Sequence, residues 1–137
     1  MKKFVLDACA IIALLRGETG YAIVQQKLED AAEQKLEIFL HRATILEIYY
    51  DSVRIVGQKK ADTILSIINA YPVNQIDDLS DIFIKDASYF KTHYKISFAD
   101  CFVLATAKTN NSTVVTSDHH EFDAIEKNGD LSFEWIR

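Results

Sequence analysis

The chain has 137 residues, of which 49% are hydrophobic and 26% charged, and its formal net charge is −5. This composition is typical of a globular domain with a substantial core, and the sequence contains no low-complexity segment and no internal repeat. The acidic balance argues against a general polyanion-binding protein, although carboxylates gathered at a metal site would also lower the net charge. We expect a single domain spanning residues 1–137.

Apolar runs and helical periodicity alternate along the chain. In chain order they predict a strand at 3–7, helices at 8–16 and 21–34, a strand at 36–40, helices at 44–56 and 60–71, an edge strand at 73–76, helices at 79–94 and 97–108, a strand at 113–117, a helix at 121–127 and a strand at 131–136. Strands separated by helices favour a parallel sheet with helices on both faces. The predicted fold class is therefore α/β, a three-layer α/β/α domain whose central sheet is mainly parallel.

Two features bear on where the protein resides. Cys9 and Cys101 have no paired spacing, and we expect small buried hydrophobes with free thiols, as in a reducing cytosol. Asp7 interrupts the apolar run that follows Met1, so no signal peptide is expected, and no stretch has the length of a membrane span. The sequence predicts a soluble, cytoplasmic protein without a membrane partner.

Four carboxylates stand out by their positions, and they are Asp7, Glu47, Asp100 and Asp118. Asp7 and Asp118 each follow a predicted buried strand, and open α/β sheets place their sites at the carboxyl ends of strands. Asp100 and Glu47 lie on largely apolar helices, and no lysine or arginine adjoins any of the four. A buried charge is costly unless it is paired or binds a metal.

Each acid also has a structural interpretation. Asp7 and Asp118 can cap the helices that follow them, while Glu47 with Thr44 and Asp100 with Ser97 fit capping boxes. Taken singly, each acid is better explained as a cap. Together, carboxylates at one sheet edge would repel one another unless a divalent cation relieved the repulsion, and oxygen ligands select Mg²⁺ or Mn²⁺. Such an ion binds phosphate and activates water, which indicates phosphodiester hydrolysis.

Other polar residues lie close to the last of these acids. Thr116 either places a hydroxyl beside the metal or only ends a strand, and we favour the first interpretation. Asp123 is either a further acid of the site or a surface residue. His119 and His120 do not indicate a zinc site, because adjacent side chains diverge and no distant ligand completes a spacing, and we expect them in an exposed loop.

The acids lie within four short motifs that follow one another along essentially the whole chain. These motifs are Val5–Ala10, Ala43–Tyr50, Ser97–Ala107 and Val114–Asp123. In this order, in a chain of this length, they resemble the motifs of PIN-domain ribonucleases, and within that family those of VapC-like toxins from bacterial toxin–antitoxin pairs. One departure stands out, because many members carry a hydroxyl residue just after the first Asp, where this chain has Ala8-Cys9.

The resemblance implies that Asp7, Glu47, Asp100 and Asp118 bind Mg²⁺ or Mn²⁺ in an endoribonuclease that cleaves single-stranded RNA or RNA loops. It also implies a homodimer and a small antitoxin protein, which lays a helix or tail over the groove and brings a basic side chain to the acids. The alternative is a PIN-like module that binds RNA or a protein without catalysis. Divalent-ion binding would distinguish the two.

Overall fold

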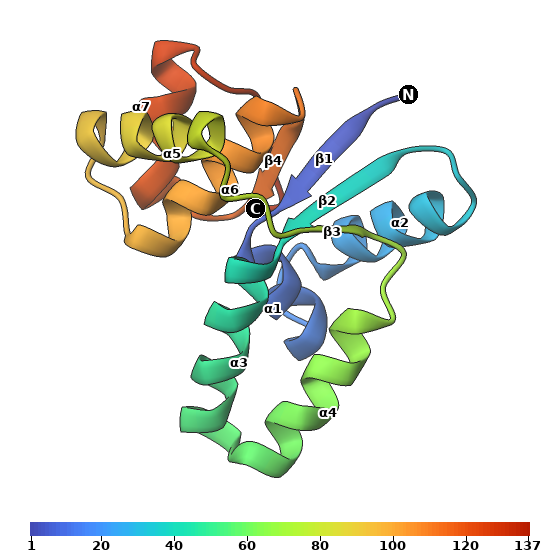
Figure 1. Cartoon of the computed structure of the whole chain (residues 1–137). Coiled ribbons are helices and arrows are strands. Elements are labelled where there is room, and N and C mark those ends of the chain that lie inside the picture. Colours follow the sequence, from blue (N-terminus) through green and yellow to red (C-terminus); the bar gives the residue numbers. More distant parts are fainter.

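The computed structural model describes residues 1–137, and a parallel sheet of five strands forms its centre (Figure 1). The strands are β1 (Lys3–Leu6), β2 (Glu37–His41), β3 (Asn74–Ile76), β4 (Thr113–Thr116) and β5 (Phe133–Trp135). Their order across the sheet is β3-β2-β1-β4-β5, and every neighbouring pair is parallel. Strand β1 thus lies in the middle, between β2 and β4.

Helices cover both faces of this sheet, which confirms the predicted three-layer α/β/α architecture. They are α1 (Ala8–Arg16), α2 (Tyr21–Ala32), α3 (Arg42–Val56), α4 (Gln58–Asn69), α5 (Asp81–His93), α6 (Phe98–Thr109) and α7 (His119–Asn128). The order of strands and helices is the predicted one, and the element ends differ from the prediction by at most two residues. None of the helices has the length and apolarity needed to cross a membrane.

The two halves of the core follow from the alternation of side chains along the strands. Phe4 and Leu6 of β1 pack in the cluster that holds α1 and α2, while Val5 packs in the cluster that holds α6 and α7. The same alternation continues in β2 and β4. Because the central strands are buried on both faces, they read as continuous apolar runs, as parallel strands usually do.

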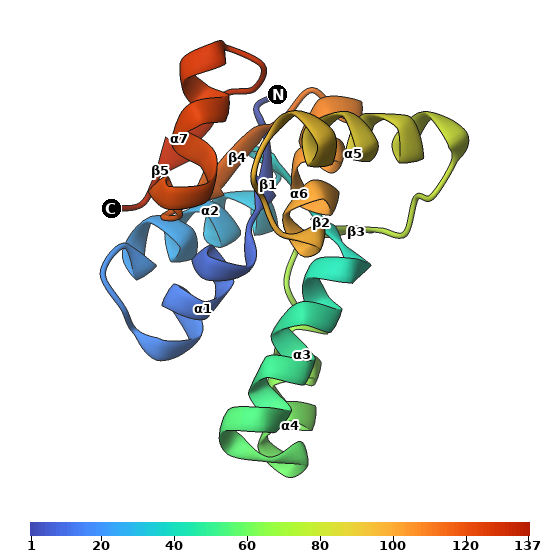
Figure 2. The ribbon, with the colours of Figure 1, turned by 90° about the vertical axis from the view of Figure 1, so that its left-hand side faces the viewer.

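Helices α3 and α4 form a hairpin that extends away from the sheet on the side of the carboxyl ends of the strands (Figures 1 and 2). Ile48 and Ile68 anchor this hairpin in the cluster around α1. Ile55 and Val56 are exposed at the tip of the hairpin, and Ile67, near the end of α4, is exposed as well. The hairpin therefore forms one wall beside the sheet edge at which the acids were predicted.

Two helix starts differ from the prediction in an informative way. Helix α3 begins at Arg42 and is capped by His41, whose Nδ1 accepts the Ala43 N–H at 2.9 Å, so Thr44 and Glu47 do not form the predicted capping box. Helix α7 begins at His119, so the prediction of a loop for His119 and His120 was wrong, although both are exposed. Asp118 caps α7, so this helix begins two residues before the predicted start at 121.

A close backbone approach fixes the start of α2. Gly20 caps this helix with a φ of 93°, in the left-handed region that favours glycine. A Cβ atom at this position would meet the backbone carbonyl of Ile136, at the end of the chain. The absence of a side chain at Gly20 thus lets the segment after β5 pack against the start of α2.

Candidate metal centre

A polar cleft of about 360 Å³ opens at the carboxyl ends of β1 and β4, between α3 and the start of α6. The residues that line it are Asp7, Ala8, Cys9, Ile12, Glu47, Tyr50, Asp51, Arg54, Ser97, Asp100, Asp118 and Glu121. All four acids singled out from the sequence are among them, joined by two that were not, Asp51 and Glu121. Asp123 is not among them, because it is exposed on α7 and pairs with His119.

Asp7 is buried at the end of β1 and is held by three donors. Its Oδ1 accepts the Ala8 N–H at 2.8 Å, which caps α1. Its Oδ2 accepts the Thr116 hydroxyl at 2.9 Å and the Cys9 thiol at 3.2 Å. Burial raises the pKa of Asp7 above its usual range and the charge of Asp118 adds to the rise, while the three hydrogen bonds oppose it.

Asp100 lies in the first turn of α6 and forms the predicted capping box with Ser97. Asp100 Oδ2 accepts the Ser97 N–H at 3.1 Å, and Ser97 Oγ accepts the Asp100 N–H at the same distance. Burial, followed by the charge of Asp7, raises the pKa of Asp100 to about 7. Without a counterion this carboxyl group therefore keeps its proton to a higher pH than a free carboxyl group does.

Asp118 and Glu121 approach Asp100 from the start of α7. Asp118 Oδ1 accepts the Glu121 N–H at 3.0 Å and so caps that helix. One carboxylate oxygen from each of Asp100, Asp118 and Glu121 lies within 4.8 Å of the others. Glu121 Oε2 is fully buried and has no hydrogen-bond partner, whereas nearly all buried polar atoms in folded proteins have one.

Glu47 completes the acidic lining from α3, on the opposite wall. Its carboxyl group is half-buried, and burial together with the charges of Asp7 and Asp51 raises its pKa. The only basic side chain of the cleft, Arg54, is engaged with Asp51 in an ion pair within α3. Five carboxylates thus share the cleft without a basic partner.

The capping and metal-binding interpretations of the aspartates are compatible in this geometry. Asp100 and Asp118 each use one oxygen for a cap and leave the other without a hydrogen bond to the protein. The donor set consists of carboxylate oxygens, the ligands that Mg²⁺ and Mn²⁺ prefer. The unpartnered Glu121 oxygen and the raised pKa values indicate excess negative charge, which a divalent cation would balance. The residues present therefore fit such an ion.

Besides Asp51, sequence reasoning missed two residues of the site, Glu121 and Cys9. Glu121 follows Asp118 at the spacing of a capping box, so its pattern signalled a helix start, and only its unpartnered oxygen marks it as a candidate ligand. Cys9 was expected to be a buried hydrophobe, and this was wrong, because it is half-buried, lines the cleft and makes polar contacts. Thr116, for which a role was favoured, is buried and hydrogen-bonded to Asp7.

The model of the PIN domain family matches residues 4–128. The chain belongs to the PIN domain family. The match spans the cleft together with both halves of the core, so the acids lie within the family's own fold. A search of curated proteins finds no match to this chain.

Solved structures share the fold of this PIN domain at low sequence identity. The DNA-bound VapBC structure from Salmonella typhimurium has a TM-score of 0.76 at 14% identity and covers 100% of both chains. VapBC2 from Rickettsia felis, bound to a promoter DNA fragment, has a TM-score of 0.73 at 16% identity and covers 96% of this chain and 97% of the other. VapC20 from Mycobacterium tuberculosis, described as a Sarcin-Ricin loop cleaving toxin, has a TM-score of 0.61 at 15% identity, with 81% of this chain and 86% of the other covered.

Proposed function

We propose that this PIN domain is a divalent-metal-dependent endoribonuclease and the toxin component of a type II toxin–antitoxin system. The observation that carries the proposal is the cleft, in which five carboxylates lack a basic partner and one buried carboxylate oxygen lacks any partner. The shared fold with VapC20, described as a Sarcin-Ricin loop cleaving toxin, supports the choice of RNA as substrate. Residues 1–137 would act as one domain.

Asp7, Glu47, Asp100 and Asp118 would hold Mg²⁺ or Mn²⁺, Glu47 either directly or through water, and Glu121 would add a further carboxylate. A bound ion supplies Lewis-acid chemistry, polarising the phosphate and lowering the pKa of water. Contacts within the chain position the carboxylates that would hold the ion. Three hydrogen bonds fix the Asp7 carboxylate, and Asp100, whose pKa is raised to about 7, would give up its proton on holding a cation.

The cleft itself would repel RNA, because its carboxylates and the phosphate backbone carry charges of the same sign. Substrate would enter only after the cation had offset that charge. We therefore expect RNA binding at the cleft, and not only the chemical step, to depend on the divalent ion.

The test is cleavage of a mixed-sequence single-stranded RNA by the purified chain with Mn²⁺, with Mg²⁺ or with EDTA, beside Asp7→Asn. Asparagine caps helices as well as aspartate does, so this variant removes the charge and keeps the cap of α1. We expect metal-dependent cutting that the variant reduces by at least about a hundredfold. Equal cutting by the variant would overturn the assignment of Asp7.

A catalytically inactive binding module predicts a different outcome in a second measurement. A metal site stabilises the fold when it is filled, by about 2.7 kcal/mol at a hundred times the dissociation constant. We expect Mn²⁺ to raise the melting temperature of the wild type and to leave the double variant Asp7→Asn/Asp100→Asn unchanged. Absence of both cleavage and metal-dependent stabilisation would favour the binding module.

We propose that a small antitoxin protein binds across the cleft and the apolar groove beside it. The groove lies between α1 and the α3–α4 hairpin, and its apolar lining includes Leu15, Ile48, Ile55, Ile64 and Ile67. Ile12 and Asp51 line both the groove and the acidic cleft, so the two surfaces are continuous. A partner with an apolar helix followed by a basic residue would match both at once.

The groove is tested by co-purification with the product of a small gene immediately upstream of the gene for this chain, where one is found. Ile67 is 43% exposed in the groove, so Ile67→Asp would place a charge there without emptying the core. We expect this variant to lose the partner and to keep RNA cleavage. Ile82→Asp, at an exposed position outside the groove, is the control and should retain the partner.

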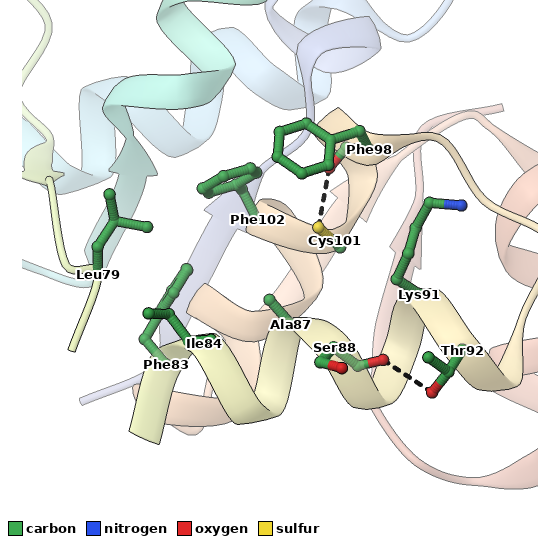
Figure 3. A pocket seen from close by; sticks show the side chains of 10 residues that line it. All are labelled: Leu79, Phe83, Ile84, Ala87, Ser88, Lys91, Thr92, Phe98, Cys101 and Phe102. Carbon is green, nitrogen blue, oxygen red and sulfur yellow. Dashed lines mark hydrogen bonds between the residues drawn. The ribbon is translucent and has the colours of Figure 1, made fainter. Parts of the chain in front are cut away.

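We also propose a homodimer, formed through the groove between α5 and α6 (Figure 3). Leu79, Ile84 and Phe98 line this groove and are 60%, 51% and 71% exposed. Two copies of a chain with a net charge of −5 repel each other, and the only charged side chain lining this groove is Lys91. A second copy can therefore approach here without bringing carboxylates together.

A further inference from the structure

Cys9 bridges the ends of the central strand β1 and its neighbour β4. Its Sγ donates to Asp7 Oδ2 at 3.2 Å, and the Ser117 N–H donates to Cys9 Sγ at 3.3 Å. The thiol also lies 3.2 Å from Thr116 Oγ1, which donates to the same Asp7 oxygen. The side chain thus contacts the acid after β1 and the residues that end and follow β4.

These contacts limit which Asp7 oxygen can serve a cation. An ionised carboxylate offers about four lone-pair positions. Cys9 and Thr116 take the two on Oδ2, and the Ala8 N–H takes one on Oδ1. One position on Oδ1 is left, and the carboxylate cannot turn without breaking the two bonds to Oδ2.

The contacts also link Asp7 to Asp118. The Asp118 N–H donates to Thr116 Oγ1 at 3.0 Å, and Thr116 and Cys9 both donate to Asp7. Through Ser117, the same thiol holds the backbone that leads to Asp118. The relative placement of two candidate ligands therefore depends on one half-buried sulfur atom.

We propose that Cys9 is a positioning residue of the metal centre, whose thiol fixes the Asp7 carboxylate and ties it to the segment that carries Asp118. This inference rests on the proposed function and deepens it. Hydrogen-bond partners behind metal ligands are worth about 10- to 100-fold in metal affinity or activity when they are removed. We expect an effect at the lower end of that range, because a thiol is a weak donor.

The experiment compares three substitutions at Cys9 by calorimetric titration with Mn²⁺, without RNA. Cys9→Ala removes the donor and the volume, Cys9→Val removes the donor but fills the space, and Cys9→Ser keeps a donor and an acceptor. We expect the Ala and Val variants to bind Mn²⁺ about tenfold more weakly and the Ser variant to stay within about threefold of the wild type. The thiol of Cys101 donates to the Phe98 carbonyl and not to a carboxylate, so Cys101→Ala is the matched control with unchanged affinity.

A role limited to packing predicts the opposite pattern, in which Cys9→Val binds Mn²⁺ as well as the wild type, and that result would overturn the proposal. Thermal unfolding in EDTA checks each variant, and if Cys9→Ala does not fold, the Val and Ser pair carries the comparison. In parallel cleavage assays, the Mn²⁺ concentration for half-maximal rate should rise about tenfold in Cys9→Val, with the KM for RNA at saturating Mn²⁺ unchanged.

The outcomes separate this inference from the proposed function. If the wild type binds Mn²⁺ but cuts no RNA, the nuclease proposal fails, while the binding series still decides the role of Cys9. If the wild type cuts RNA and Cys9→Val matches it in metal binding and rate, only the role of Cys9 fails. If the wild type binds no Mn²⁺, both fail.

Discussion

Asp7 and Asp118 cap the starts of helices, Asp100 lies in the first turn of one, and all three line the cleft. An aspartate at a helix start receives backbone N–H groups on one oxygen and is placed by the helix it caps. The cap therefore sets the position of the carboxylate at no further conformational cost. A buried aspartate at the end of a strand, with no base beside it, deserves to be considered for both roles at once.

The raised pKa of Asp100 predicts how stability changes with pH when no divalent ion is present. Between the usual value of 3.8 and about 7, the folded chain keeps a proton that the unfolded chain has lost. Stability therefore falls as pH rises through this window and is level above it. From about pH 5.5 to about pH 8 in EDTA, we expect a loss of up to about 2 kcal/mol, seen as a lower melting temperature.

The contribution of Asp100 is isolated by Asp100→Asn, which keeps the capping position and cannot titrate. The pKa of His119 is raised by the Arg137 carbonyl and by Asp123, so its contribution to stability also falls as pH rises. The effect of Asp100 is therefore the difference between the pH profiles of the wild type and Asp100→Asn. We expect the variant to show a clearly smaller loss over the same pH range. Identical pH profiles would contradict the raised pKa of Asp100.

Replacing Glu121 should change the stability of the metal-free chain and its affinity for Mn²⁺ in opposite directions. Its buried Oε2 has no partner and adds charge beside Asp100 and Asp118. Glu121→Gln removes that charge and supplies a donor, so without metal we expect a gain of about 1 kcal/mol in the free energy of unfolding. The same variant should bind Mn²⁺ about tenfold more weakly or worse.

The control for Glu121 is Asp123→Asn, which removes an exposed carboxylate from the same helix outside the cleft. Thermal unfolding in EDTA and calorimetric titration with Mn²⁺ measure the two effects. Mn²⁺ affinity that falls equally in both variants would indicate a general effect of charge and not a ligand.

At the scale of single residues, the sequence was most informative where an acid followed a predicted buried strand and had no basic residue beside it. Asp7 and Asp118 could be predicted to meet because parallel strands end at one edge, and the structure brings them to one cleft. Glu121 and Cys9 could not, because their local patterns are those of a helix cap and a small hydrophobe. Their contacts exist only after β1 and β4 have paired, and no local pattern contains that information.

Among the elements, the start of α2 offers the sharpest prediction. Gly20→Ala would place a Cβ atom against the backbone of Ile136 at a positive φ, so strain and overpacking add. We expect a loss of about 3 kcal/mol in the free energy of unfolding. Gly17 also has a positive φ, but open space surrounds it. Gly17→Ala should therefore lower the free energy of unfolding by only about 1 kcal/mol. Chemical denaturation of the two variants measures the difference, and equal losses would contradict the close approach.

The strands and helices were predictable because each one shows the hydrophobic pattern of its type. Their ends were less so, and α3 shows why. Thr44 and Glu47 match a common capping pattern, but His41 provides the actual cap with its ring nitrogen. The ring of His41 packs against Phe83 and Phe102 and bonds to the Asp78 carbonyl, so tertiary packing decides where this helix begins.

For the whole molecule, the proposed dimer yields a test that does not involve the cleft. Ile84→Glu would place a like charge in the groove between α5 and α6 on both copies. We expect it to shift the chain from dimer to monomer in light scattering coupled to size-exclusion chromatography. Ile82→Glu lies on the same helix at 70% exposure but does not line the groove, and it should remain dimeric. A variant at Ile84 that stays dimeric would place the contact elsewhere.

The order of the strands along the chain determines the stage of synthesis at which the cleft can form. β1 opens the chain, yet its partner β4 comes more than a hundred residues later, and the hydrogen bond from Thr116 to Asp7 spans 109 positions. During synthesis on the ribosome, the central strand pair cannot close until Thr113–Thr116 have left the exit tunnel. An unfinished or prematurely terminated chain would carry Asp7 and Glu47 without their partners. A nascent chain of this fold therefore cannot assemble the complete acidic cleft before β4 has emerged and paired with β1.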